Sequence, residues 1–199
     1  SQLVCRDQAG SVRCYPLVQT HQYHRVCDWV LTPAPVPQAV QAFARNIAVS
    51  LLTAIDYVGV LSIEFFYGPD GLQVNEIAPR THNSGHVTIE AAATSQFAQQ
   101  ARIVAGLPMG EVELTMPGAL MVNLLGFERA AGDPYAPKRQ ALAGLPEAVL
   151  HWYGKQGSSL GRKLGHVTLR LSGNTAEDRE QEARRRLEEV RAIWPRPIY

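Results

Sequence analysis

The sequence reads VLSIEFFY at residues 60–67, GPDG at 68–71 and LQVNEI at 72–77. Two apolar runs with β-branched and aromatic residues, separated by a glycine- and proline-rich turn, are typical of a β-hairpin. This hairpin is the most informative part of the chain, because its two strands carry acidic side chains in an otherwise apolar pattern. We therefore take the hairpin as the starting point for both the fold and the chemistry.

Two glutamates fall opposite each other when the hairpin closes. A three-residue loop at 69–71 makes the pairing symmetric, so that Phe66 faces Val74 and Glu64 faces Glu76. Directly opposed residues share a face of the sheet, with Cβ atoms about 5 Å apart, and like charges there are destabilising. A shared proton, a divalent cation such as Mg²⁺, or ion pairs with Lys or Arg would offset the repulsion. The spacing alone leaves these alternatives open.

The rest of the chain mixes strand and helix patterns, which predicts an α/β (α+β) fold. Apolar residues recur at helical spacing over residues 37–56, ahead of the hairpin. Prolines and a glycine at 108, 110 and 117 predict a domain boundary, so we expect one domain at 1–110 and a smaller β-rich domain at 111–199. The other expected elements are strands within 1–19 and at 26–32, 119–125, 149–153 and 166–171, and helices at 88–105, 138–148 and 175–194.

The composition argues against several classes of protein. The chain has 19 Lys and Arg residues and 18 Asp and Glu residues, so it lacks the basic excess typical of nucleic-acid-binding proteins. No apolar run approaches the roughly 20 residues of a membrane span. The cysteines, Cys5, Cys14 and Cys27, are odd in number and lack metal-ligand spacing, so we expect free thiols in a reducing cytoplasm. The expected partners are small molecules, with no nucleic acid and no membrane.

A polar loop follows the second strand of the hairpin and reads RTHNSGH at residues 80–86. The guanidinium of Arg80 suits carboxylate or phosphate oxygens, and His82 and Asn83 add further polar groups. The loop leads into a predicted helix, whose N-terminus favours anions. Taken by itself, the segment is equally compatible with a polar surface loop.

A third polar group lies between two later strands, as YGK at 153–155 and GRK at 161–163. The glycines allow the backbone to approach a ligand closely, and the charges of Lys155 and Arg162 suit a phosphate monoester. A solvated hairpin tip would explain the same residues.

Several motifs occur together and in a fixed order along the chain. In combination they resemble the C-terminal part of the 5-(carboxyamino)imidazole ribonucleotide synthases, a family of ATP-grasp ligases, over nearly all 199 residues. The resemblance implies an ATP-grasp C-terminal lobe with an antiparallel sheet and helices, followed by a small β-rich domain. The motifs are VNEIAPR at 74–80, HNSGH at 82–86, TSQF at 94–97, MVNLLG at 121–126, YGK at 153–155 and GRKLGH at 161–166.

The family's reaction, as the resemblance implies, belongs to de novo purine biosynthesis. ATP activates bicarbonate as carboxyphosphate, and the 5-amino group of aminoimidazole ribonucleotide is then carboxylated. By motif, Mg²⁺ would be held by Glu64 and Glu76, and the nucleotide would contact Asn75 and Glu76. The implied catalytic residues are Arg80, His82 and Lys155, and the implied substrate-binding residues are Arg80, Asn83, Ser84, Lys155 and Arg162.

The resemblance covers only the C-terminal part of the family. The family's N-terminal domain and its central lobe with the glycine-rich loop have no counterpart in the sequence. We therefore expect the activity in a full-length parent, a cytoplasmic homodimer, and expect the chain alone to be inactive. The alternatives are another ATP-grasp ligase, such as the formate-dependent glycinamide ribonucleotide transformylase, or a non-catalytic binding fragment. The loop at 82–86 argues against the transformylase.

Overall fold

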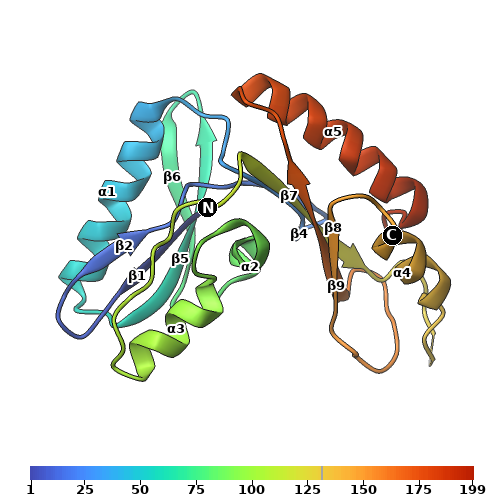
Figure 1. Cartoon of the computed structure of the whole chain (residues 1–199), viewed down its shortest axis with the longest axis horizontal. Coiled ribbons are helices and arrows are strands. Elements are labelled where there is room, and N and C mark those ends of the chain that lie inside the picture. Colours follow the sequence, from blue (N-terminus) through green and yellow to red (C-terminus); the bar gives the residue numbers. More distant parts are fainter. Residues whose placement is uncertain (131) are drawn as a thin grey trace. The chain divides into compact units, whose positions relative to one another are not determined.

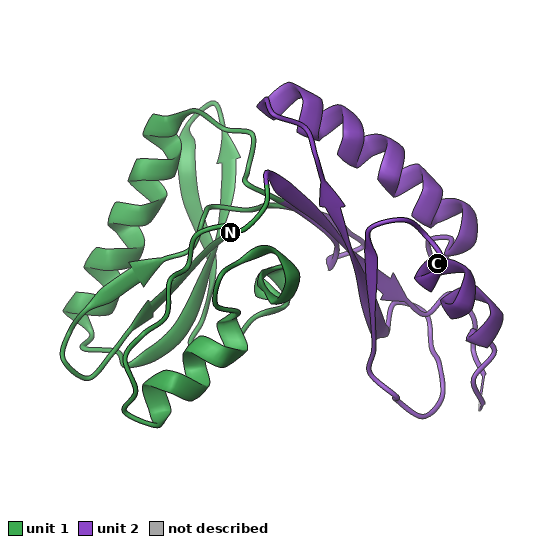
Figure 2. Cartoon of the chain, viewed as in Figure 1, with its two compact units in different colours: residues 1–19, 32–116 green, residues 20–31, 117–199 purple. Residues whose placement is uncertain are grey.

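The computed structural model describes residues 1–130 and 132–199, which form two compact units (Figures 1 and 2). Unit 1 comprises residues 1–19 and 32–116, and unit 2 comprises residues 20–31 and 117–199. The boundary near 116 lies a few residues beyond the one expected from the prolines. Residues 20–31 belong to unit 2 because they form most of two strands, at 19–23 and 26–32, of its sheet. This long-range pairing is not revealed by local sequence patterns.

Unit 1 is a four-stranded antiparallel sheet in the order β2-β1-β5-β6. The predicted hairpin forms its last two strands, and the N-terminal strands pair as expected. Its strands are β1 (Gln2–Arg6), β2 (Val12–Cys14), β5 (Gly59–Gly68) and β6 (Gly71–Ala78), and its helices are α1 (Gln38–Ala54), the 3₁₀ helix η1 (Asn83–Gly85), α2 (Thr88–Ala91) and α3 (Gln96–Val104).

Helices cover both faces of this sheet, with α1 on one side and α2 and α3 on the other (Figure 1). Alternate residues of β5 serve the two faces: Leu61 packs against Leu52 of α1, whereas Val60 packs in a cluster with Ile103 of α3. Because successive strand side chains point to opposite faces, the next even-numbered residues of β5, Ser62 and Glu64, face the side of α2 and α3.

Unit 2 is a five-stranded sheet in the order β3-β4-β7-β9-β8. One face packs against α4 and α5 around the buried ring of Trp194, whose Nε1 donates to the carbonyl of Leu125 at 2.8 Å. Thr175 and Asp178 cap α5 reciprocally, as the sequence predicted for its start. The strands are β3 (Gln19–Tyr23), β4 (Val26–Thr32), β7 (Gly118–Leu125), β8 (Ala148–Trp152) and β9 (Lys163–Leu171), and the helices are α4 (Ala136–Ala143) and α5 (Ala176–Ile193).

The predicted α/β class is confirmed, with corrections at the level of elements. The helix expected over 138–148 ends at Ala143, and the strand β3 was not expected. The single helix expected over 88–105 is wrong, because the chain adopts an extended conformation at Ala92 and two separate helices form. The side chain of Ser95 accepts the N–H of Ala98 at 3.2 Å and starts α3 afresh. Within the described parts of the chain, no helix is both long and apolar enough to cross a membrane.

We expect Leu52→Ala to lower the free energy of unfolding by about 2–5 kcal/mol, because it opens a cavity between α1 and the sheet where Leu52 is fully buried. Leu107→Ala is the control, since that side chain is 53% exposed and its loss should change stability by less than about 0.5 kcal/mol. Urea unfolding followed by circular dichroism measures both variants. Equal effects would contradict the packing of α1.

Candidate functional site

Glu64 and Glu76 lie directly opposite each other in the register of β5 and β6, as the sequence predicted. The Glu64 side chain is 13% exposed, whereas Glu76 is exposed on the edge strand. Among residues 1–130 and 132–199, no Lys or Arg forms an ion pair with either carboxylate. The alternative of ion pairs with Lys or Arg therefore finds no support in the described residues.

The hairpin reaches this register by a route that differs from the predicted one. Its loop has two residues, 69–70, rather than three, so Phe65 and not Phe66 faces Val74. A β-bulge then inserts Asn75 as an extra residue in β6 and restores the pairing of the two glutamates. The prediction of Phe66 opposite Val74 was wrong, and the bulge compensates for the shorter loop at the site itself.

The polar loop after β6 brings further groups to the same end of the sheet. Arg80 is exposed, and its Nη1 donates to the carbonyl of Thr81 at 3.1 Å. A guanidinium carries five N–H groups, so an anion can still bind to this side chain. Asn83 is half-buried and begins η1.

His82 connects this loop to the glutamate pair, because its Nδ1 lies 3.9 Å from Oε1 of Glu64. That distance is too long for a hydrogen bond. Nδ1 instead accepts the backbone N–H of Ser84 at 3.4 Å and lies 2.9 Å from the Ser84 hydroxyl. Because Nδ1 accepts a main-chain N–H, these bonds favour the tautomer with its proton on Nε2, which can then donate to an anion.

Ser84, which the resemblance placed among the substrate-binding residues, is only 1% exposed. Its hydroxyl lies 2.9 Å from Nδ1 of His82, 2.9 Å from the hydroxyl of Ser1 and 3.4 Å from that of Ser62. The structure thus places Ser84 behind His82, in a buried cluster of hydroxyl groups.

Lys155 and Arg162 lie in unit 2, on the loop between β8 and β9, and each bonds to main-chain carbonyls of this loop or of the first residue of β9. Nζ of Lys155 donates to the carbonyl of Lys163 at 2.7 Å. Nη1 of Arg162 donates to the carbonyls of Gln156 and Gly157 at 2.7 and 3.1 Å. Both cations therefore hold the loop in shape, in addition to any contact that they make with a ligand.

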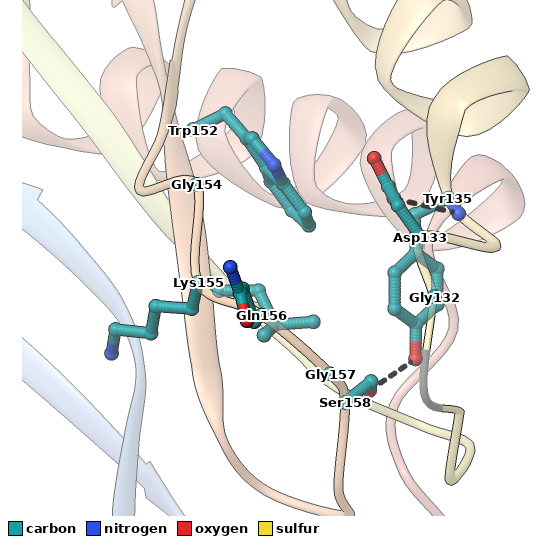
Figure 3. Close-up of a pocket in the computed structure, with 10 residues that line it drawn as sticks. Gly132, Asp133, Tyr135, Trp152, Gly154, Lys155, Gln156, Gly157 and Ser158 are labelled. Atoms are coloured by element: carbon teal, nitrogen blue, oxygen red, sulfur yellow. Dashed lines mark hydrogen bonds between the residues drawn. The ribbon is translucent and has the colours of Figure 1, made fainter.

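A cavity of about 310 Å³ borders the same loop, lined by the rings of Tyr135 and Trp152 and by residues 154–158. The Tyr135 hydroxyl lies 2.8 Å from that of Ser158. The ammonium group of Lys155 points away from this cavity (Figure 3). The cavity and the Lys155 charge are therefore separate features of the loop.

A contact between Tyr153 and His166 connects the segment at 153–155 to strand β9. The Tyr153 hydroxyl lies 2.8 Å from Nδ1 of His166, and burial raises the pKa of Tyr153 to about 12. The phenol therefore keeps its proton at neutral pH and can donate it to Nδ1. This bond connects the start of the loop that carries Lys155 to strand β9.

The sequence interpretation gave no role to Gln96, which the structure buries completely next to the loop at 82–86. A signal was present, because Gln96, Gln99 and Ile103 follow a helical spacing and all three are buried. Two glutamines on the apolar stripe of a helix indicate buried carboxamides, which need specific hydrogen-bond partners.

Two family models match the chain. Residues 1–97 match the model of the ATP-grasp domain, and residues 119–182 match the model of the phosphoribosylaminoimidazole carboxylase C-terminal domain. The N5-carboxyaminoimidazole ribonucleotide synthase of Synechococcus elongatus is 54% identical over 195 residues, which cover 98% of this chain and 49% of that protein.

Solved structures of N5-carboxyaminoimidazole ribonucleotide synthases are also similar to this chain. The N5-carboxyaminoimidazole ribonucleotide synthetase of Thermus thermophilus has a TM-score of 0.82 at 38% identity, covering 100% of this chain and 51% of that chain. The Aspergillus clavatus synthase, in complex with ADP and 5-aminoimidazole ribonucleotide, has a TM-score of 0.83 at 31% identity, covering 95% of this chain and 50% of that chain. The chain thus spans about half the length of these relatives.

Proposed function

We propose that this chain, a member of the N5-carboxyaminoimidazole ribonucleotide synthase family of ATP-grasp ligases, supplies part of the site that carboxylates 5-aminoimidazole ribonucleotide. Bicarbonate takes the γ-phosphoryl group of ATP, which gives carboxyphosphate and ADP. The 5-amino nitrogen then attacks the carboxyl carbon and loses a proton, and phosphate leaves. The observation that carries this proposal is the opposed pair Glu64 and Glu76 beside His82, in a chain that is similar to these synthases.

Glu64 and Glu76 would hold Mg²⁺ against the phosphates of ATP. The donors fit this ion, because Mg²⁺ takes carboxylate and phosphate oxygens and a cation would relieve the repulsion between the two side chains. When bound, Mg²⁺ neutralises charge on the phosphate oxygens during phosphoryl transfer. Asn75, which is exposed in the bulge beside Glu76, would contact the nucleotide together with Glu76.

The loop at 80–84 would bind the small anion. Arg80 presents a guanidinium fork to bicarbonate and then to carboxyphosphate, and His82 donates from Nε2 to the same group. Asn83 lies beside them at the start of η1. Ser84 acts through His82, because its hydroxyl and backbone N–H both contact Nδ1.

Lys155 and Arg162 would bind the phosphate of the ribonucleotide, and Lys155 would also reach the reacting end. Their main-chain carbonyl partners are neutral, whereas a phosphate dianion forms charge-assisted hydrogen bonds that are roughly twice as strong. The family resemblance further supports a cytoplasmic homodimer for the full-length protein. The cysteines are free thiols, as a reducing compartment requires.

Turnover by the full-length protein tests the function directly. We expect ADP and phosphate to be released in step with carboxylation when ATP, Mg²⁺, bicarbonate and aminoimidazole ribonucleotide are all present. The 199-residue chain alone should release no phosphate above background, because ATP-grasp chemistry closes two lobes over the nucleotide. Turnover that instead requires formate and glycinamide ribonucleotide would contradict the assignment, and so would no turnover by the full-length protein.

Glu64→Gln should reduce Mg²⁺-dependent turnover of the full-length protein to near background, because it removes a ligand of the cation. The same change should raise the free energy of unfolding by about 0.2–1 kcal/mol, because it relieves the repulsion with Glu76. Glu188→Gln, on an exposed face of α5, is the control and should leave both quantities unchanged. Near-normal kinetics for Glu64→Gln would exclude the metal site.

Arg162→Ala should raise the KM for the ribonucleotide about 10- to 100-fold, because one charge-assisted hydrogen bond contributes roughly 1.5–3 kcal/mol. The KM for ATP should stay nearly constant. Arg170→Ala is the control, since Arg170 lies exposed on strand β9, which follows the loop that carries Arg162, and its side chain forms an ion pair with Glu147 at 3.7 Å. A raised KM for ATP with normal ribonucleotide saturation would instead assign this loop to the nucleotide.

A further inference from the structure

The carboxamide of Gln96 bonds to both the main chain of His82 and the ring of His86. Its Oε1 accepts the N–H of His82 at 2.9 Å, and its Nε2 donates to the carbonyl of the same residue at 2.7 Å. Nε2 also lies 3.0 Å from Nδ1 of His86. Because the His82 N–H needs an acceptor and its carbonyl needs a donor, the hydrogen bonds determine which end of the carboxamide is oxygen.

The protonation of His86 follows from the same geometry. A carboxamide has two N–H groups, and one of them is directed to the carbonyl of His82. The other is directed to Nδ1 of His86, which therefore accepts and leaves the ring proton on Nε2. All the hydrogen-bonding groups of the Gln96 side chain thus serve residues of one short loop.

The surroundings of Gln96 leave it little freedom to move. A Cβ atom at Gly85 would lie 2.5 Å from Oε1 of Gln96, so only glycine fits at this position of the loop. The backbone N–H of Gln96 donates to the Thr88 hydroxyl at 2.9 Å, and that hydroxyl donates to the carbonyl of Gly85 at 2.6 Å. The loop is therefore fastened to α3 at His82, Gly85 and His86.

We propose that Gln96 is a positioning residue of the carboxylation site, which sets the main chain of His82 and the ring of His86. This inference rests on the function proposed above, in which His82 contacts the bicarbonate-derived anion. The direction of a side chain follows its main chain, so a shift at His82 moves Nε2 away from that anion. Misplacement of a catalytic group by about 1 Å can lower turnover on the order of 100-fold. We expect the binding of ATP to stay unchanged.

Gln99, one turn further along α3, offers a closely matched control. It is also fully buried, and its carboxamide clamps the main chain of a single residue in the same manner. Oε1 accepts the N–H of Gly110 at 2.9 Å, and Nε2 donates to the carbonyl of Gly110 at 3.1 Å. Gly110 is not part of the loop at 82–86, so Gln99→Leu reproduces the structural loss alone.

The kinetic test compares three variants of the full-length protein that retain a cooperative thermal transition. Gln96→Leu should lower kcat about 10- to 100-fold and change the KM for ATP by less than about twofold. Gly85→Ala should give the same pattern, because its methyl group displaces the carboxamide. Gln99→Leu should lower Tm comparably to Gln96→Leu and leave kcat within about threefold of the wild type. Normal kcat in Gln96→Leu, or an equal loss in Gln99→Leu, would overturn the proposal.

A spectroscopic test on the 199-residue chain does not depend on turnover and covers the case in which Gln96→Leu fails to fold. Nitrogen-15 NMR of the rings should find the proton of His86 on Nε2 in the wild type. Gln96→Glu places a carboxylate against Nδ1 and should move a proton there. A proton on Nδ1 already in the wild type, or no change in Gln96→Glu, would overturn the proposal. If the wild-type full-length protein does not carboxylate the ribonucleotide, the proposed function fails, while these ring signals still show whether Gln96 holds the loop.

Discussion

The repulsion between Glu64 and Glu76 is the constraint on which the candidate site of unit 1 depends. Strand β5 is covered on both faces, by α1 and by α3, so Glu64 cannot move away from its neighbour without disturbing two apolar clusters. Strand β6 is an edge strand, and the bulge at Asn75 sets Glu76 opposite. No Lys or Arg of the described chain forms an ion pair with either carboxylate, and the Mg²⁺ that we propose for this pair would relieve the repulsion.

The loop at 82–86 and the loop between β8 and β9 show a second common principle. In both, polar side chains hold the main chain of the loop in place. Arg162 bonds to two carbonyls of its own loop, and Gln96 of α3 bonds to the main chain of His82 and the ring of His86 in the loop at 82–86. Groups held in this way lose little further freedom when a substrate binds, which favours catalysis by positioning.

Local patterns predicted most of the fold, including the hairpin, the long helix α1 and the capped helix α5, because these depend on residues close in sequence. The pairing of Glu64 with Glu76 was predicted correctly, but from a three-residue loop that the structure does not have. A two-residue loop without the bulge would pair Glu64 with Asn75. The two-residue loop and the bulge were not predictable, since either loop length suits the same residues. Residues 20–31 joined the second sheet through long-range pairing, and the partners of Gln96 depend on how α3 packs. Neither leaves a local signature.

The position of a metal ion is the most direct test of this account. Crystals of the full-length protein grown with ATP and Mn²⁺, an oxygen-binding substitute for Mg²⁺, would give an anomalous difference map that locates the ion. The account predicts a peak bound by carboxylate oxygens of both Glu64 and Glu76, at distances of about 2.1 Å. A map with no peak at this pair, or a Lys or Arg side chain lying between the two carboxylates, would contradict it.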